Sequence, residues 1–244
     1  MATAPERVRR ALLRVASQAR RDLQAVARAA GKDPAAIRAG LFATAPVIVS
    51  DYNLGAATLA LDWYEEIRDE VAPRRLFVPT VRTRVSDEDV AATVARTTAA
   101  LLDAEPTNLD RVTAESMADL EAEVQRKVVS GFRDTITENV VADPAAVGWR
   151  RFARPEACKF CLMLADRGAV YTAATARFAA HGREMRGGRK GGECMCIAGP
   201  AFGGKETWAN ATPMQYVASK RKRTEKERAA LRDYLNHNFP DAPG

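Results

Sequence analysis

The sequence predicts a mainly α-helical protein with three parts. We expect a helical N-terminal body over residues 1–147, a small cysteine-rich α+β module over 148–205, and a basic C-terminal helix with a tail over 206–244. Three observations support this division. Apolar residues recur every three to four positions through most of the first part. All four cysteines lie between residues 158 and 196, and a run of Lys and Arg opens the last helix.

The first predicted helix covers residues 5–30. Its apolar positions follow a helical period: Val8, Leu12, Val15, Ala19, Leu23 and Val26. Gly31 is a typical helix stop, and Asp33-Pro34 provides an N-cap and a first-turn proline for a restart. A short helix over 34–42 follows.

A second helical stretch begins at Ala45 and closes before Pro73. It is rich in aromatic residues, and its "DWYEEIRDE" segment has the composition of a surface used in protein packing. Residues 73–84 contain two prolines and β-branched residues, which favours an extended loop or a short strand.

Ser86-Asp87-Glu88-Asp89 is a strong helix start, with Asp89 at the capping-box spacing. The helix is expected to reach about residue 103 and to be followed by a break over 105–110. A long helix over 111–141 comes next, with Gly131 as a candidate kink, and Asp143-Pro144 ends it.

Charge and hydropathy limit the class of protein. The 244 residues carry a formal net charge of +6, which favours an anionic partner, although a mildly basic protein without such a partner has the same composition. No apolar run reaches about 18 residues, so no membrane span is expected. The Arg-rich start lacks the apolar core and cleavage site of a secretory signal.

The cysteines form two half-sites. Cys158 and Cys161 make a C-x2-C pair, and Cys194 and Cys196 make a C-x-C pair after 32 intervening residues. Four thiolates suit one structural Zn²⁺, and His181 between the pairs is a further candidate ligand. The alternatives are two disulfides, a redox C-x2-C and four free buried thiols. The zinc interpretation ranks first and makes residues 148–205 a zinc-stapled α+β module.

Two basic segments are candidates for double-stranded DNA contact without sequence reading. One is the glycine-rich stretch 183–193, which follows a predicted strand over 167–173. The other is the start of the C-terminal helix. A plain solvated surface is the alternative for both. The candidate residues are Arg183, Arg186, Arg189, Lys190, Lys220, Arg221, Lys222, Arg223, Lys226 and Arg228.

No catalytic constellation stands out. The chain has two histidines, His181 and His237, and no serine lies in a nucleophile-elbow motif. A cysteine paired with His181 would compete with metal binding for the same groups. Enzymatic activity is therefore the weaker expectation, and no catalytic residue is assigned.

The cysteine-rich region resembles the MuF-like minor capsid, or phage head morphogenesis, proteins of tailed phages, of the actinobacteriophage type. The resemblance covers residues 57–70 and 149–202, about a third of the chain. The shared pattern consists of Trp149, Cys158, Cys161, Arg167-Gly168-Ala169-Val170-Tyr171, His181, Cys194, Cys196, Pro200 and Phe202. In that family the histidine lies close before C-x-C. Here residues 182–193 separate them, and the four thiols alone suffice for a site.

The resemblance implies a virion protein inside the phage head that is made in the host cytoplasm. Its implied partners are the portal protein, the major capsid or scaffold protein, and packaged DNA during assembly, packaging or ejection. Some relatives are labelled capsid maturation protease, so cleavage of scaffold or major capsid protein is the alternative function, with Ser130 or a cysteine as its nucleophile. A free-standing zinc-dependent nucleic-acid regulator is a third alternative.

Overall fold

The computed structural model describes residues 4–71, 76–153, Leu162, Ala165, 197–202 and 225–238. The chain divides into two compact units. Unit 1 comprises Met1–Glu65 and Val78–Glu138, and unit 2 comprises Glu66–Phe77 and Asn139–Gly244. The boundaries predicted at residues 147/148 and 205/206 remain predictions.

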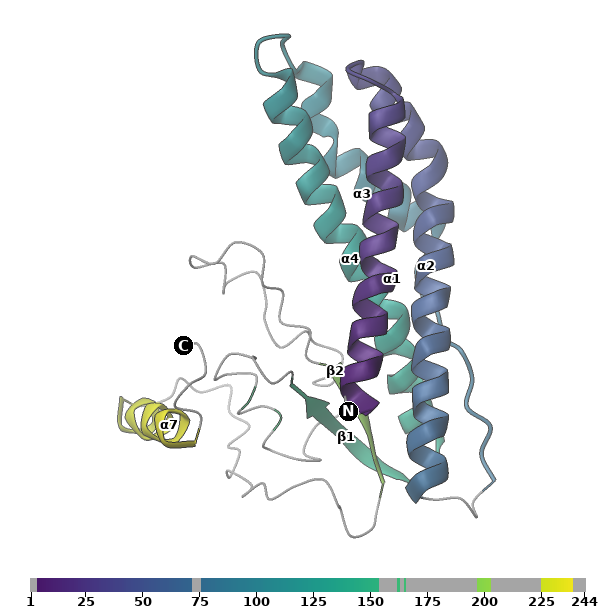
Figure 1. Cartoon of the computed structure of the whole chain (residues 1–244), viewed down its shortest axis with the longest axis vertical. Helices are drawn as coiled ribbons and strands as arrows, with labels where there is room; N and C mark the ends of the chain where they lie inside the picture. Colours follow the sequence, from purple (N-terminus) through teal and green to yellow (C-terminus); the bar gives the residue numbers. More distant parts are fainter. Residues whose placement is uncertain are drawn as a thin grey trace. The chain divides into compact units, whose positions relative to one another are not determined.

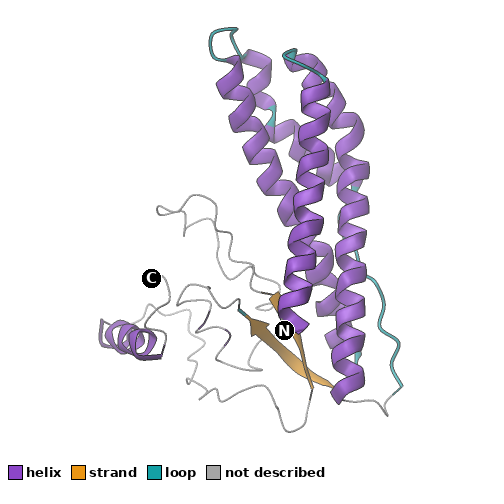
Figure 2. Ribbon diagram, in the orientation of Figure 1, coloured by secondary structure: helices purple, strands orange, loops and turns teal. Residues whose placement is uncertain are grey.

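Unit 1 is built from long helices that run side by side (Figures 1 and 2). The elements in chain order are α1 (Ala4–Ala29), α2 (Pro34–Val71), α3 (Asp87–Thr97), the 3-10 helix η1 (Ala99–Asp103) and α4 (Leu109–Ala142). The C-terminal ends of α2 and α4 belong to unit 2. The prediction of a mainly helical protein is confirmed. None of the helices in the described parts of the chain is long and apolar enough to cross a membrane.

The core of unit 1 consists of apolar side chains that α1, α2 and α4 direct inward. Trp63 and Phe132 stack with ring centroids 5.7 Å apart, and both are 1% exposed. Tyr64 is fully buried. The aromatic residues of the "DWYEEIRDE" segment therefore serve packing within the chain, since burial of large aromatic side chains is a main source of folding free energy. Other fully buried members of the core include Leu12, Leu23, Leu41, Leu120 and Ile136.

The turn between α1 and α2 follows the sequence prediction. Gly31 has a φ of 72°, a left-handed conformation that favours glycine and ends α1. Asp33 then caps α2, since its Oδ1 accepts a 2.9 Å hydrogen bond from the backbone N–H of Ala35.

The expectation of separate helices over 34–42 and from Ala45 is wrong, because α2 is continuous and contains Pro46. Proline costs one backbone hydrogen bond inside a helix. Ile37, Leu41, Ala45 and Val49 lie on one fully or almost fully buried face on both sides of Pro46. Packing along this face offsets the local cost and keeps the helix intact.

The start of α3 follows its prediction and the end does not. Ser86 caps the helix, with its Oγ accepting a 3.2 Å hydrogen bond from the N–H of Asp89. The helix ends at Thr97, and a 3-10 turn covers Ala99–Asp103. Thr98 Oγ1 donates a 2.6 Å hydrogen bond back to the Val94 carbonyl, which competes with continuation of the α-helix.

The proline-containing stretch is a loop over residues 76–85, as predicted. Within unit 1, a reciprocal pair of hydrogen bonds attaches this loop to α4. The N–H of Arg82 donates to Thr135 Oγ1, and Thr135 Oγ1 donates to the Arg82 carbonyl, both at 3.0 Å.

Gly131 does not interrupt α4, which is one continuous helix. The glycine instead permits close approach to α2. A Cβ atom at this position would lie 2.3 Å from the Asn53 carbonyl oxygen and 2.9 Å from Asn53 Cγ. Asn53 Nδ2 donates to the Lys127 carbonyl at 2.6 Å, and this contact requires the short distance between helices.

The described part of unit 2 contains the ends of α2 and α4, two strands and one further helix. The strands are β1 (Ala146–Phe152) and β2 (Ile197–Phe202), and the helix is α7 (Glu225–Asn238). A C-terminal helix is confirmed over Glu225–Asn238, and its predicted beginning at residue 206 lies outside the described residues. Neither strand is predicted from the sequence. Arg150 and Arg151 interrupt the alternation of apolar and polar residues that would indicate a strand at β1. Pro200 argues against a strand at β2.

Candidate metal centre

The two strands of unit 2 enclose the cysteine-rich segment in the sequence and pair with each other in space. β1 and β2 are antiparallel, with Trp149 opposite Pro200 and Phe152 opposite Ile197. Ala146 lies opposite Phe202 at the other end of the pairing. Trp149, Pro200 and Phe202, which begin and end the shared motif, therefore meet in one two-stranded sheet.

This register brings the chain toward both cysteine pairs from one end of the sheet. Phe152 is the last residue of β1, and Cys158 follows it by six residues in the sequence. Ile197, its partner, is the first residue of β2 and directly follows Cys196. Opposed Cα atoms in an antiparallel pair lie about 5 Å apart, and six residues span at most about 20 Å. The pairing of Phe152 with Ile197 is therefore compatible with all four thiols sharing one ion.

The predicted ligands themselves lie outside the described residues. This holds for Cys158, Cys161, Cys194, Cys196 and His181. Within the described parts of the chain, no group of three or more His, Cys, Asp or Glu side chains is arranged to hold a metal. The structure thus describes the support of the candidate site and not its ligand set.

Most residues of the two-stranded sheet are buried. All six residues of β2 are buried, and so are Trp149, Arg150 and Arg151 of β1. The Arg150 guanidinium lies over the Phe152 ring, 5.3 Å from its centroid. Among the described atoms, Trp149 Nε1 is buried without a hydrogen-bond partner. An isolated pair of strands is marginal in water, so this burial fixes the sheet as an anchor.

A buried ion pair in unit 2 positions the start of β1. Arg68 Nε lies 2.7 Å from Asp143 Oδ2, and the side chains are 6% and 0% exposed. Asp143 Oδ1 accepts a 2.9 Å hydrogen bond from the N–H of Ala145. The guanidinium of Arg68 also lies over the Phe77 ring at 5.5 Å. Asp143 thus connects the end of α2 to the turn that leads into the sheet, a role that the sequence did not reveal.

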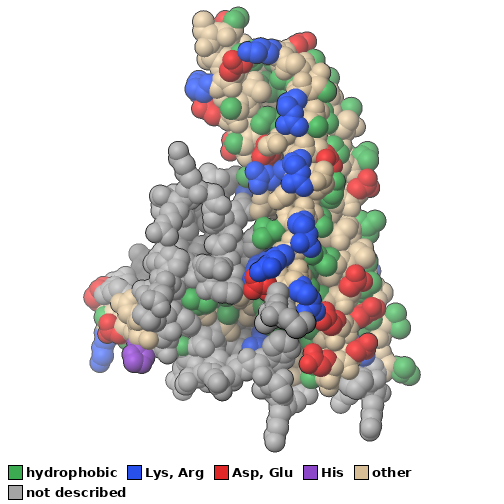
Figure 3. Space-filling model, in the orientation of Figure 1, with side chains coloured by type: hydrophobic (Ala, Val, Ile, Leu, Met, Phe, Trp, Pro, Cys, Tyr) green, Lys and Arg blue, Asp and Glu red, His purple; other side chains and the backbone are tan. Residues whose placement is uncertain are grey.

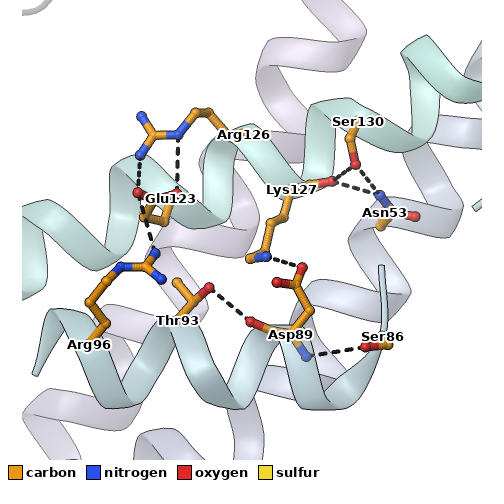
Figure 4. A network of polar contacts seen from close by, with 9 residues as sticks. All are labelled: Asn53, Ser86, Asp89, Thr93, Arg96, Glu123, Arg126, Lys127 and Ser130. Carbon is orange, nitrogen blue, oxygen red and sulfur yellow. Dashed lines mark hydrogen bonds and ion pairs between the residues drawn. The ribbon is translucent and has the colours of Figure 1, made fainter. Parts of the chain in front are cut away.

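Ser130, the serine considered as a nucleophile, lies in a polar network of unit 1 (Figure 4). Its Oγ donates a 2.7 Å hydrogen bond to the Lys127 carbonyl and accepts one from Asn53 Nδ2 at 3.3 Å. Lys127 pairs with Asp89, while Glu123 contacts Arg96 and Arg126 (Figure 4). Ser130 therefore lies in a helix–helix contact, and the hydrogen bonds of its hydroxyl connect α4 to α2.

Of the ten predicted DNA-contacting residues, Lys226 is the one whose side chain the structure describes. It lies on α7 and is exposed. Arg183, Arg186, Arg189, Lys190, Lys220, Arg221, Lys222, Arg223 and the side chain of Arg228 lie outside the described part of the molecule.

A match to a known protein family extends over both the helical body and the cysteine-rich segment. The model of the VG15 protein family matches residues 1–222. The chain belongs to the VG15 protein family. This is a family of viral proteins from phages, so the prediction of a phage protein is confirmed. No curated protein and no solved structure matches the chain.

Proposed function

We propose that this VG15 family protein is a minor capsid, or head morphogenesis, protein of a tailed phage. In this proposal it is located inside the head, associates with the portal, and contacts packaged DNA during assembly, packaging or ejection. The observation that carries the proposal is the pairing of β1 with β2. It joins Trp149 to Pro200, which are distant members of the motif shared with MuF-like proteins.

The second part of the proposal is a structural Zn²⁺ held by Cys158, Cys161, Cys194 and Cys196. Thiolates are the ligands that structural zinc sites use most, and a closed four-thiolate site leaves no open position for chemistry. The sheet register supports a shared ion, because the segments that carry the two cysteine pairs are both attached to the same end of the two-stranded sheet. His181 is a replacement ligand in this proposal. The ion would staple the cysteine-rich segment to the buried sheet.

The outer surface of unit 1 is the proposed contact with the portal or with capsid protein. The aromatic residues Trp63 and Tyr64 are unavailable because they are buried. Val47 and Leu54 of α2 are 61% and 51% exposed, and they lie one heptad apart on the same face of the helix. Exposed apolar residues in such a row are typical of protein contacts.

Zinc content tests the metal centre. We expect elemental analysis to find about one zinc per wild-type chain and none in the Cys158→Ser/Cys161→Ser variant. His181→Ala is compared with His237→Ala, which alters an exposed histidine on α7. Zinc retained by both histidine variants would assign the site to the thiols alone. A wild-type chain purified without zinc and with four reactive thiols would contradict the metal centre.

Co-expression with the portal and major capsid proteins encoded by the same phage tests the role in the head. We expect the wild-type chain to co-purify with the portal and to be present in purified heads. The Val47→Ser/Leu54→Ser variant should lose the association. Leu102→Ser, which alters a residue of η1 that is 64% exposed, is the matched control. A specific cleavage product of the capsid or scaffold protein, abolished by one point change, would favour a maturation protease instead.

A further inference from the structure

α1 carries a regular row of exposed arginines that the sequence analysis did not assign. Arg7, Arg14, Arg21 and Arg28 are spaced by seven residues, and all four are exposed. Seven residues advance a helix by about 10.5 Å, so the row extends over about 32 Å. The heptad spacing drifts by about 20° per step, which keeps all four side chains within one face. Figure 3 shows Lys and Arg side chains gathered in a column over this helix.

The row lies opposite the face of α1 that is buried in unit 1. Arg7, Arg14 and Arg21 each come two residues after one buried residue and two residues before another, and Arg28 directly follows buried Ala27. Two residues correspond to about 200° of helix rotation, so the arginines point away from the core. All four side chains are therefore accessible on the surface of α1. The buried neighbours of the row are Pro5, Arg9, Leu12, Ala16, Ala19, Leu23 and Ala27.

The two carboxylates of α1 leave the net charge of this face positive. Glu6 contacts Arg9 and Arg10 at 3.5 and 2.8 Å. Asp22 accepts hydrogen bonds from Tyr52 and Gln18 at 2.6 and 2.8 Å. Arg20, the remaining arginine in the middle of the helix, is directed toward α4 and pairs with Glu121 at 2.9 Å. The helix thus separates arginines used in packing from arginines kept on the surface.

We propose that Arg7, Arg14, Arg21 and Arg28 form a binding surface for the phosphate backbone of double-stranded DNA. The length of the row is close to one turn of B-DNA, about 34 Å. A uniform polyanion matches such a row in any register, whereas an acidic helix would need carboxylates in a matching repeat. Guanidinium groups bind phosphate oxygens with two hydrogen bonds, and such contacts carry no sequence information. The choice of DNA rests on the proposed function, and this surface is additional to the basic segments 183–190 and 219–232.

The test is DNA binding by the full-length protein, measured by fluorescence anisotropy on a random-sequence duplex of about 30 base pairs over a range of salt concentrations. Arg7→Gln/Arg14→Gln/Arg21→Gln/Arg28→Gln removes the row. The matched control removes the same charge from other elements of unit 1, by Arg82→Gln/Arg84→Gln/Arg96→Gln/Arg111→Gln. A third variant replaces the four arginines of the row with lysine. Circular dichroism checks that each variant retains its helices.

We expect the row variant to bind at least tenfold more weakly at about 0.1 M salt, and to lower the slope of log K against log salt by about 3 to 4. The control variant should change the slope by less than 1, and the lysine variant should keep most of the salt dependence of the wild type. Equal slopes for the row variant and the control would overturn the inference, as would absence of DNA binding by the wild type. So would unchanged DNA binding together with lost binding to an acidic protein.

A failure of this inference can be distinguished from a failure of the proposed function. A fourth variant, Lys220→Gln/Arg221→Gln/Lys222→Gln/Arg223→Gln, removes charge from the C-terminal basic segment alone. If that variant loses DNA binding while the row variant does not, the inference about α1 fails and the proposed role in the head stands. Co-purification with the portal tests that role without reference to DNA.

Discussion

Arg68 and Asp143 form a buried ion pair of 2.7 Å that joins the end of α2 to the turn before β1. The two residues are far apart in the sequence, and both belong to unit 2. Asp143 also holds the N–H of Ala145, so one carboxylate serves two chain segments. The first prediction concerns this pair.

Removing one partner of the pair should destabilise unit 2 strongly. Asp143→Ala removes the carboxylate that pairs with the buried Arg68 guanidinium, and we expect a loss of about 3–5 kcal/mol in the free energy of unfolding. Arg68→Met/Asp143→Ala should recover part of this loss, because the buried guanidinium is removed together with the carboxylate. Urea denaturation measures both. Asp110→Ala is the control, since Lys32 and Asp110 form an ion pair that is about 80% exposed at each end and should contribute less than about 1 kcal/mol. Equal losses at Asp143 and Asp110 would contradict the prediction.

Replacement of two helical glycines by alanine should change the stability of unit 1 in opposite directions. At Gly131 a Cβ would collide with the backbone of Asn53, so Gly131→Ala should destabilise unit 1 by about 1–3 kcal/mol despite the higher helix propensity of alanine. At Gly55 the new Cβ would have no neighbour within 4 Å apart from the adjacent residues and the backbone of its own helix, and Gly55→Ala should stabilise by up to about 1 kcal/mol. Thermal unfolding of the two variants provides the comparison. A stabilising Gly131→Ala would show that α2 and α4 are not in close contact.

The hydrogen bond between Tyr52 and Asp22 predicts a loss of stability at alkaline pH. Its donation to the Asp22 carboxylate, with burial and the negative charge of Asp22, raises the pKa of Tyr52 to about 12. The phenol of an unfolded chain ionises near pH 10. The contribution is therefore complete below about pH 10 and disappears as the pH rises from about 10 to 12.

Tyr52→Phe should remove about 1 kcal/mol of stability at neutral pH, and the difference from wild type should vanish near pH 12. The measurement is urea denaturation at a series of pH values, with ultraviolet absorbance to follow tyrosine ionisation. Tyr234→Phe, which removes a phenol from α7, is the control. A difference between Tyr52→Phe and wild type that stays constant up to pH 12 would refute the role of the hydrogen bond.

Metal removal should act on one unit only. Under the proposed zinc centre, a chelator should release the cysteine-rich segment from its anchor, and amide hydrogens of β1 and β2 should exchange faster. Peptides from α1 should keep their protection, because unit 1 contains no cysteine. Hydrogen exchange with mass spectrometry, with and without chelator, distinguishes the two. Unchanged exchange in both strands would argue against a metal staple.

The helical character of the body and several of its helix boundaries follow from the sequence alone. Gly31, Asp33 and Ser86 act locally through a left-handed turn and side-chain caps, and local chemistry of this kind is readable from neighbouring residues. The same holds for the extended character of the proline-containing loop. The grouping of all four cysteines between residues 158 and 196 is likewise visible in the sequence.

Features in which residues distant in the sequence act together depend on the folded arrangement of the chain. Pro46 is tolerated because buried neighbours on both sides hold α2 in place, and Gly131 is required by the backbone of Asn53 and not by its own helix. The strands β1 and β2 form because each provides hydrogen bonds for the other, so neither short segment shows a strong pattern alone. Burial likewise separated Arg20, which pairs with Glu121, from Arg21, which lies on the exposed row. Such outcomes depend on what each side chain meets after the chain has folded, and a linear sequence does not specify that directly.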